Sequence, residues 1–177
     1  MKGKCIAAGL ALVVSCSAPA WAIDGVALEG GNGDHVDRVQ AALQWDWKKP
    51  LLQFSTWQVG GYWDVSLGYW WRSNVAPGEH KDLFDLGFTP VFRVQPNSLT
   101  GPYVEAGIGA HVLSHSSIGD KHMSTAFQFG DHIGVGYRFG VKRAFDLSYR
   151  FQHLSNAGIK EPNPGINFNM LRLQYRF

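Results

Sequence analysis

The stretch FDLSYRFQHLS, which covers residues 145–155, alternates between apolar and polar side chains. Successive side chains of a β-strand point to opposite faces, so a period of two predicts a strand with one apolar face. Its apolar row consists of Phe145, Leu147, Tyr149 and Phe151. The same row then continues with His153 and Ser155, at positions where the alternation calls for apolar side chains.

Runs with the same alternation recur along the whole chain. Besides the one at Phe145, they begin near Ile23, Val39, Trp63, Phe84, Val104, Phe127 and Leu171. Short stretches rich in glycine, proline and asparagine separate them, as is typical of turns between strands. The sequence therefore predicts an all-β fold of eight antiparallel strands. The segment from Leu51 to Trp57 is ambiguous between an extension of a strand and a short helix.

Eight alternating strands fit two architectures. A soluble sandwich or lipocalin-like barrel turns its apolar rows inward, whereas a transmembrane barrel turns them towards lipid and keeps a polar interior. Charged, glycine-rich polar rows and the C-terminal LQYRF, with its final phenylalanine on the apolar row, favour the transmembrane barrel. Aromatic residues also gather near the strand ends, as in the external aromatic belts at the two membrane interfaces of such barrels: Trp45, Trp47, Trp63, Tyr69, Trp70 and Trp71. Polar-row charges such as Glu105 and Arg138 are expected to pair inside the lumen.

Residues 1–22 have the features of a secretory signal peptide. Two lysines precede an apolar stretch that is too short to span a bilayer, and Ala20-Trp21-Ala22 supplies small residues where signal peptidase cuts. Cleavage there leaves residues 23–177 as the mature domain, and a lipoprotein-type site at Cys16 is the alternative. Both cysteines leave with the signal peptide, as do two of the 16 basic residues and none of the 14 acidic ones. The mature chain therefore has no disulfide and no net charge that would indicate nucleic acid as a partner.

The expected topology places the polar end of strand 145–155 near the cell exterior. An even number of strands puts both termini at the periplasmic side of an outer-membrane barrel and the longer loops outside. His153 and Ser155 then lie near the outer leaflet. The final strand brings Asn167 to the same row. The apolar residues between 166 and 170 have the opposite parity, so a bulge there would turn Asn167 to the other face.

The pair His153 and Ser155 has the composition of a hydrolase site. A hydroxyl nucleophile needs a general base nearby, and the α-carbons of two neighbours on one strand face are about 6.6 Å apart. Asn156 and the glycine-containing loop that follows it offer donors for an oxyanion. The alternative is that these polar residues simply mark the membrane interface, where they cost little. The other histidines considered lack metal-ligand spacing and are expected in the lumen or loops: His111, His115, His122 and His132.

Three stretches of the sequence resemble the lipid A 3-O-deacylases of the PagL family: YVEAGIGAHV, AFQFGDHIGVGYRFG and HLSNAGIKEPNPGIN. The resemblance covers nearly the whole mature chain and is strongest towards the C-terminus. It implies an eight-stranded barrel in the outer membrane of a Gram-negative bacterium. It also implies a carboxylic ester hydrolase that removes the 3-hydroxyacyl chain from position 3 of lipid A by a serine-hydrolase mechanism, without a cofactor or a metal.

The family's site residues are carried over by position. Ser155 matches the nucleophile, His153 the general base, and Asn156 and Asn163 the positions linked to activity and oxyanion stabilisation. The position that orients the histidine, usually acidic in the family, is Asn167 here. Because an amide carries no charge, this departure predicts a working but slower triad. Glu161 in the preceding loop is the alternative orienting group.

The resemblance also defines the expected partners and the competing functions. Lipid A, as part of lipopolysaccharide in the outer leaflet, is the expected substrate, and its phosphates have four candidate cationic partners: Arg72, Lys81, Lys121 and Lys160. A second copy of the chain, giving a homodimer, is a further partner to test. Two other functions fit the same barrel. One is a different outer-membrane lipid acyl hydrolase or acyltransferase, and the other is a non-enzymatic barrel for anchoring or adhesion.

Overall fold

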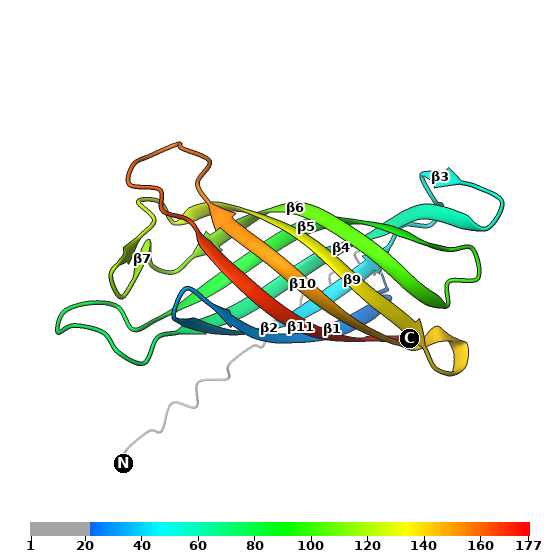
Figure 1. Cartoon of the computed structure of the whole chain (residues 1–177), viewed down its shortest axis with the longest axis horizontal. Coiled ribbons are helices and arrows are strands. Elements are labelled where there is room, and N and C mark those ends of the chain that lie inside the picture. The colour runs from blue at the N-terminus through cyan, green and yellow to red at the C-terminus, as the bar shows by residue number, and fades with distance from the viewer. Residues whose placement is uncertain (1–21) are drawn as a thin grey trace, which may run out of the picture.

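The computed structural model describes residues 22–177, which form one closed antiparallel β-barrel (Figure 1). The predicted signal peptide, residues 1–22, lies outside the described residues except for its last position. Eight long strands form the wall: β1 (Gly25–Gly33), β2 (Val36–Asp46), β4 (Trp57–Trp71), β5 (Asp82–Pro96), β6 (Gly101–Leu113), β9 (Phe127–Phe139), β10 (Phe145–Ser155) and β11 (Ile166–Arg176). The shorter elements are β3 (Leu52–Gln53), β7 (Ser117–Ile118), β8 (Lys121–His122) and the 3-10 turn η1 (Val141–Arg143). In this part of the chain, no helix has the length and apolar character needed to cross a membrane.

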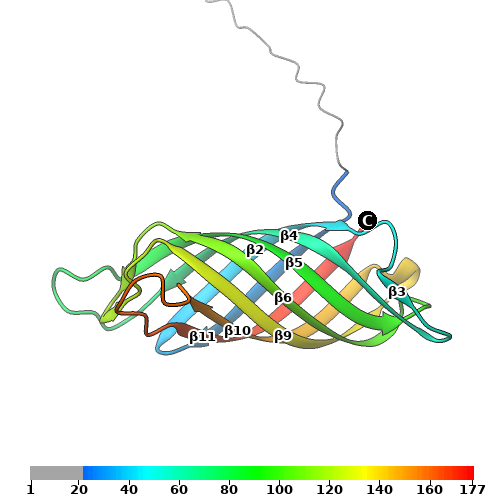
Figure 2. The ribbon, with the colours of Figure 1, turned by 90° about the horizontal axis from the view of Figure 1, so that it is seen from above.

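Hydrogen bonding between neighbouring strands closes the wall. Each long strand pairs with the next long strand along the chain, and β1 pairs with β11, so the wall has no open edge. The C-terminus and the start of β1 lie at one end of the barrel, together with β3 and η1 (Figures 1 and 2). The loops 72–81, 114–126 and 156–165 gather at the opposite end, called here the loop end (Figure 1). The predicted eight-stranded topology is confirmed.

The two faces of the wall differ as the alternation predicted. Apolar rows cover the outside, where Ile133 is 64% exposed and Leu171 is 59% exposed. The polar rows are buried in the lumen and paired there. Arg93 Nη2 lies 2.7 Å from Glu105 Oε2, and Arg138 Nε donates to Asp146 across 3.0 Å.

Two of the scattered histidines belong to this polar interior. His111 is buried and its Nδ1 lies 2.8 Å from Asp85 Oδ1, while His132 is buried on the inner row of β9. His115 and His122 lie at the loop end, outside the long strands. No group of three or more His, Cys, Asp or Glu residues within 22–177 is arranged to hold a metal ion.

The lumen is apolar, not polar, towards the loop end. A buried hydrophobic cluster fills this part of the lumen: Val36, Trp70, Leu83, Leu113, Ile118, Met123, Leu154, Ile166, Phe168 and Met170. Trp70 is fully buried in it, so its assignment to an external aromatic belt was wrong. The opposite parity of residues 166–170 reflects inward-facing apolar side chains and requires no bulge, since β10 and β11 stay in register from Phe145 to Leu154. Asn167 therefore keeps the outer face.

The ambiguous segment from Leu51 to Trp57 lies at the end opposite the loop end. Leu52 and Gln53 form the short strand β3, which pairs with Val59 and Gln58 at the start of β4. The segment thus extends the sheet and forms no helix. Its side chains are exposed, so it contributes little to the interior.

Candidate active site

His153 and Asn167 face each other on the outside of the barrel. They are directly paired residues on the neighbouring strands β10 and β11, on the row that otherwise faces lipid. His153 Nδ1 lies 2.8 Å from Asn167 Oδ1. An amide oxygen only accepts hydrogen bonds, so Nδ1 carries the proton and donates it. The other ring nitrogen, Nε2, is then left as a proton acceptor, which is the state that a general base needs.

Ser155 is the last residue of β10 and shares the outer row with His153. Both side chains are half-buried, whereas Leu154 between them points into the apolar interior. The strand geometry thus places a hydroxyl and an imidazole side by side on one face, separated by about 6.6 Å at their α-carbons. This row looks sideways out of the barrel wall, where Phe151 and Tyr149 continue it towards the other end.

Gly165 packs directly against the His153 ring. Its φ of +63° lies in the left-handed region, and a β-carbon there would come within 2.6 Å of His153 Cε1 and 3.1 Å of Nε2. A side chain at this position would therefore push the ring out of place. Glycine is required here both by the backbone conformation and by the close approach of the imidazole.

Asn156 and Asn163 have different functions in the loop between β10 and β11. The Asn156 side chain is fully buried, and its amide donates to the carbonyl oxygens of Met123 (2.9 Å) and Lys160 (2.8 Å). Its backbone N–H donates to Asn163 Oδ1 across 3.0 Å. That bond orients the Asn163 amide, whose nitrogen has no acceptor among residues 22–177. Of these two side-chain amides, the Asn163 amide is therefore the one whose nitrogen is free to donate to a further group.

Glu161, the alternative orienting group, points elsewhere. Its Oε2 accepts a hydrogen bond from the Asn163 backbone N–H at 2.9 Å, and the side chain is exposed. Of the two candidates, the structure brings Asn167 and not Glu161 into contact with His153. Glu161 instead stabilises the loop that presents Asn163.

The sequence did not predict a polar anchor that holds the backbone of Asn167 and Gly165 in place. Asp34, in the turn between β1 and β2, accepts hydrogen bonds from the Asn167 backbone N–H (3.0 Å) and from Lys121 Nζ (3.1 Å). Lys121 also donates to the carbonyl oxygen of Gly165 at 3.3 Å. Burial raises the pKa of the Asp34 carboxyl, but the bonds from Asn167 and Lys121 outweigh this and leave the pKa below its ordinary value. No signal in the sequence linked positions 34, 121 and 165.

Asp131 is a second residue that sequence reasoning missed. It is the outward-facing residue of β9 that pairs directly with His153, on the side opposite Asn167. Residues paired in this way have β-carbons about 4.5–5.5 Å apart. The signal was present in the sequence, because Asp131 interrupts the apolar row between Phe129 and Ile133.

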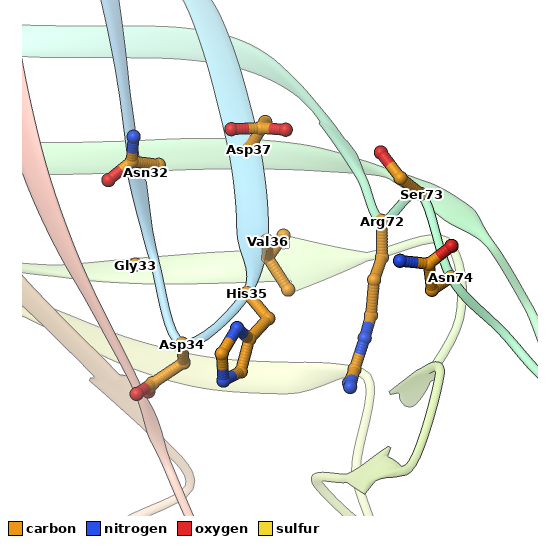
Figure 3. A pocket seen from close by; sticks show the side chains of 9 residues that line it. All are labelled: Asn32, Gly33, Asp34, His35, Val36, Asp37, Arg72, Ser73 and Asn74. Carbon is orange, nitrogen blue, oxygen red and sulfur yellow. The ribbon is translucent and has the colours of Figure 1, made fainter.

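The four predicted cationic partners divide into two kinds. Lys121 pairs with Asp34, and Arg72 forms an ion pair with Asp120. The ammonium groups of Lys81 and Lys160 have no partner in the described part of the chain. A cavity of about 560 Å³ lies beside the β1–β2 turn, and Figure 3 shows His35 and Arg72 pointing the same way along it. Of these four groups, Lys121 is the one that the contacts place beside the candidate site, because it bonds to Gly165, which packs against the His153 ring.

Comparison with known proteins identifies relatives over most of the chain. The family described as "Lipid A 3-O-deacylase (PagL)" matches residues 37–176. A "Lipid A deacylase PagL" of Bordetella bronchiseptica is 38% identical over 160 residues, covering 86% of this chain and 83% of the relative. The protein of the same name from Pseudomonas aeruginosa is 36% identical over 150 residues, covering 84% and 83%.

A solved structure agrees with these sequence matches. The crystal structure of the outer membrane enzyme PagL superposes with a TM-score of 0.77 at 32% identity, covering 86% of this chain and 99% of that one. Fold and sequence thus point to the same relatives across the whole barrel. The chain belongs to the PagL family of lipid A 3-O-deacylases.

Proposed function

We propose that this protein is a lipid A 3-O-deacylase that works as a serine hydrolase in the outer membrane of a Gram-negative bacterium. It cleaves the ester that links a 3-hydroxyacyl chain to position 3 of lipid A and so modifies lipopolysaccharide. Family membership supports the reaction. The observation that carries the mechanism is the 2.8 Å contact between His153 and Asn167 on a row that faces lipid. The substrate stays in the bilayer, so the reacting groups must face outward.

The proposed reaction has two steps. His153 Nε2 takes the proton of the Ser155 hydroxyl while the serine oxygen attacks the ester carbonyl. The tetrahedral intermediate collapses to an acyl-enzyme, and the sugar hydroxyl leaves with the proton that His153 returns. Water, activated by the same imidazole, then releases the 3-hydroxy fatty acid and restores Ser155. The Asn163 amide is the proposed donor to the oxyanion, since Asn156 is occupied by structural bonds.

Asn167 holds the ring in the correct tautomer, as asparagine does in Cys-His-Asn enzymes. It adds no negative charge to the imidazolium that forms during the reaction. The proposed triad therefore has its orienting hydrogen bond but is weaker in electrostatics than one with an acid at this position.

The setting of the site follows from the fold. The loop end faces the cell exterior and the end with the chain termini faces the periplasm, as in bacterial barrels of this type. Cleavage after Ala22 would leave residues 23–177 as the mature enzyme, and mass measurement of the exported protein tests this boundary.

The lipid A phosphates would meet Lys81 and Lys160 first, because their ammonium groups are unpaired in the described chain. Pairing of two barrels into a homodimer belongs to the same proposal, and light scattering in detergent tests it.

The decisive experiment is mass spectrometry of lipid A from cells that express the protein. Wild type should remove the mass of one 3-hydroxyacyl chain, and Ser155→Ala should leave lipid A unchanged. Ser98→Ala, in a turn at the opposite end of the barrel, is the matched control and should keep full activity. A gain in mass would indicate an acyltransferase. Equal spectra for wild type and Ser155→Ala would contradict the proposed nucleophile.

A further inference from the structure

A second polar cavity lies at the periplasmic mouth of the lumen. It has a volume of about 180 Å³, and the side chains that matter here are Lys48, Arg93, Gln95, Arg138 and Arg176. It is remote from the candidate active site. Asp146, which binds all three arginines, is nine residues before Ser155 on β10, or roughly 30 Å along the strand.

The cavity has more positive than negative charge. A single carboxylate, that of Asp146, accepts hydrogen bonds from three arginines: Arg93 (3.1 Å), Arg138 (3.0 Å) and Arg176 (3.2 Å). Two further carboxylates only partly compensate for this excess. Glu105 divides its charge between Arg93 and Arg150, and Asp46 pairs with Arg176 at the partly exposed rim. Lys48 adds another cation to the same wall.

Hydrogen-bond donors in this wall also lack acceptors. Arg138 uses only its Nε, and its two terminal nitrogens have no acceptor among the described residues. Gln95 is 9% exposed and lines the cavity, and its side-chain amide forms no hydrogen bond with any residue from 22 to 177. These donors face the cavity without a protein acceptor, so they are available to a ligand that brings several acceptor oxygens.

We infer that the periplasmic cavity is a binding site for a phosphate group. Guanidinium groups match phosphate oxygens with paired, charge-assisted hydrogen bonds, and the ammonium of Lys48 adds a point charge. At about 30 Å³ per water molecule, the cavity has room for such an anion and a few waters. The group can belong to free phosphate in the periplasm or to the headgroup of an inner-leaflet phospholipid. The inference is independent of the deacylase proposal, because the two sites lie at opposite ends of the barrel.

The test is titration of sodium phosphate into the mature barrel in a non-ionic detergent, followed by calorimetry at constant ionic strength. We expect saturable binding of phosphate and none of chloride. Arg138→Gln should weaken phosphate binding at least tenfold, and Gln95→Leu should weaken it severalfold. Arg143→Gln removes the same charge from the neighbouring turn η1, outside the cavity, and should bind like wild type.

Two results would overturn the inference: no saturable phosphate binding by wild type, or an equal loss in Arg143→Gln. Folding of each variant is checked by its lipid A deacylation, which this cavity should not affect. If Arg138→Gln does not fold, Gln95→Leu and Lys48→Gln carry the same comparison. Repeating the titration in phospholipid nanodiscs separates the two sources. Weaker binding of free phosphate there than in detergent assigns the site to a headgroup, and equal binding assigns it to free phosphate.

Discussion

At the scale of single residues, position 167 sets the electrostatics of the proposed triad. The sequence already placed an amide there, and the structure adds its hydrogen bond to His153. We expect Asn167→Asp to raise kcat about tenfold, or about 1.4 kcal/mol of barrier, because the carboxylate stabilises the imidazolium. Asn167→Leu should lower kcat by roughly 10²- to 10⁴-fold, since the ring loses its orienting acceptor. Acyl release from purified lipid A measures both rates, and an unchanged rate in Asn167→Leu would contradict the orienting role.

The effect of substituting Asp131 on kcat should depend on whether residue 167 carries a negative charge. It lies directly across from His153 on β9, a relation that depends on strand register and could not be seen in the linear sequence. We expect Asp131→Asn to lower kcat severalfold in the wild type, because it removes a negative charge beside the imidazole. The loss should be smaller in the Asn167→Asp background, where another carboxylate supplies the charge. A double-mutant cycle on kcat measures this coupling, and strictly additive effects would mean that the two positions act independently.

At the scale of elements, the loop between β10 and β11 determines whether the histidine is held in place. Gly165→Ala should reduce activity by at least roughly 10²-fold, because its β-carbon would lie 2.6 Å from His153 Cε1. Gly158→Ala in the same loop is the matched control. It shares a positive φ (+76°) but has open space around it, so only the backbone cost of about 1 kcal/mol applies. Equal activity losses in the two variants would show that loop strain, and not contact with the ring, is responsible.

Asp34, in the turn between β1 and β2, stabilises the end of the same loop through its hydrogen bonds to Asn167 and Lys121. Asp34→Asn should lower kcat severalfold at neutral pH, since it weakens the hold on the Asn167 backbone and on Lys121. The folded pKa of Asp34 lies below its ordinary value, so its contribution is complete above about pH 4 and is lost as pH falls through the lower folded pKa. The difference between wild type and Asp34→Asn should therefore persist at pH 5 and vanish in stronger acid. Asp120→Asn breaks the ion pair with Arg72 and contacts neither His153 nor Asn167. It should leave kcat unchanged relative to wild type both at pH 5 and in stronger acid.

Loops were the elements that sequence reasoning resolved least. Alternation located every wall strand because period two is a local property. The functions of Asn156 and Asn163 depend on contacts with Met123 and with each other, and no local pattern encodes such contacts. The same limit hid the anchor formed by Asp34 and Lys121, whose residues are far apart in the chain.

At the scale of the whole molecule, the barrel has two kinds of interior. Sequence reasoning predicted the polar half, because its charged residues alternate with apolar ones. It missed the apolar half, because β11 is apolar on both faces near Met170 and parity alone cannot then assign the inner row. The apolar half lies directly behind the candidate active site, with Leu154 and Ile166 next to His153 and Asn167 in sequence. A densely packed interior there keeps the outer row rigid.

Phe168 tests this arrangement because it is fully buried in the apolar cluster and packs edge-on against Trp70. Phe168→Ala should lower the free energy of unfolding by about 3–5 kcal/mol, the usual cost of a large cavity in a packed interior. It should also reduce kcat, because the strand between Asn167 and Asn169 loses its inner support. Phe151→Ala, on the lipid-facing row of the adjacent strand and 42% exposed, leaves no such cavity and should cost much less. Urea titration of the folded barrel in liposomes measures both variants. If Phe151→Ala were the more destabilising change, the lipid-facing row and not the apolar interior would be the main support of the site.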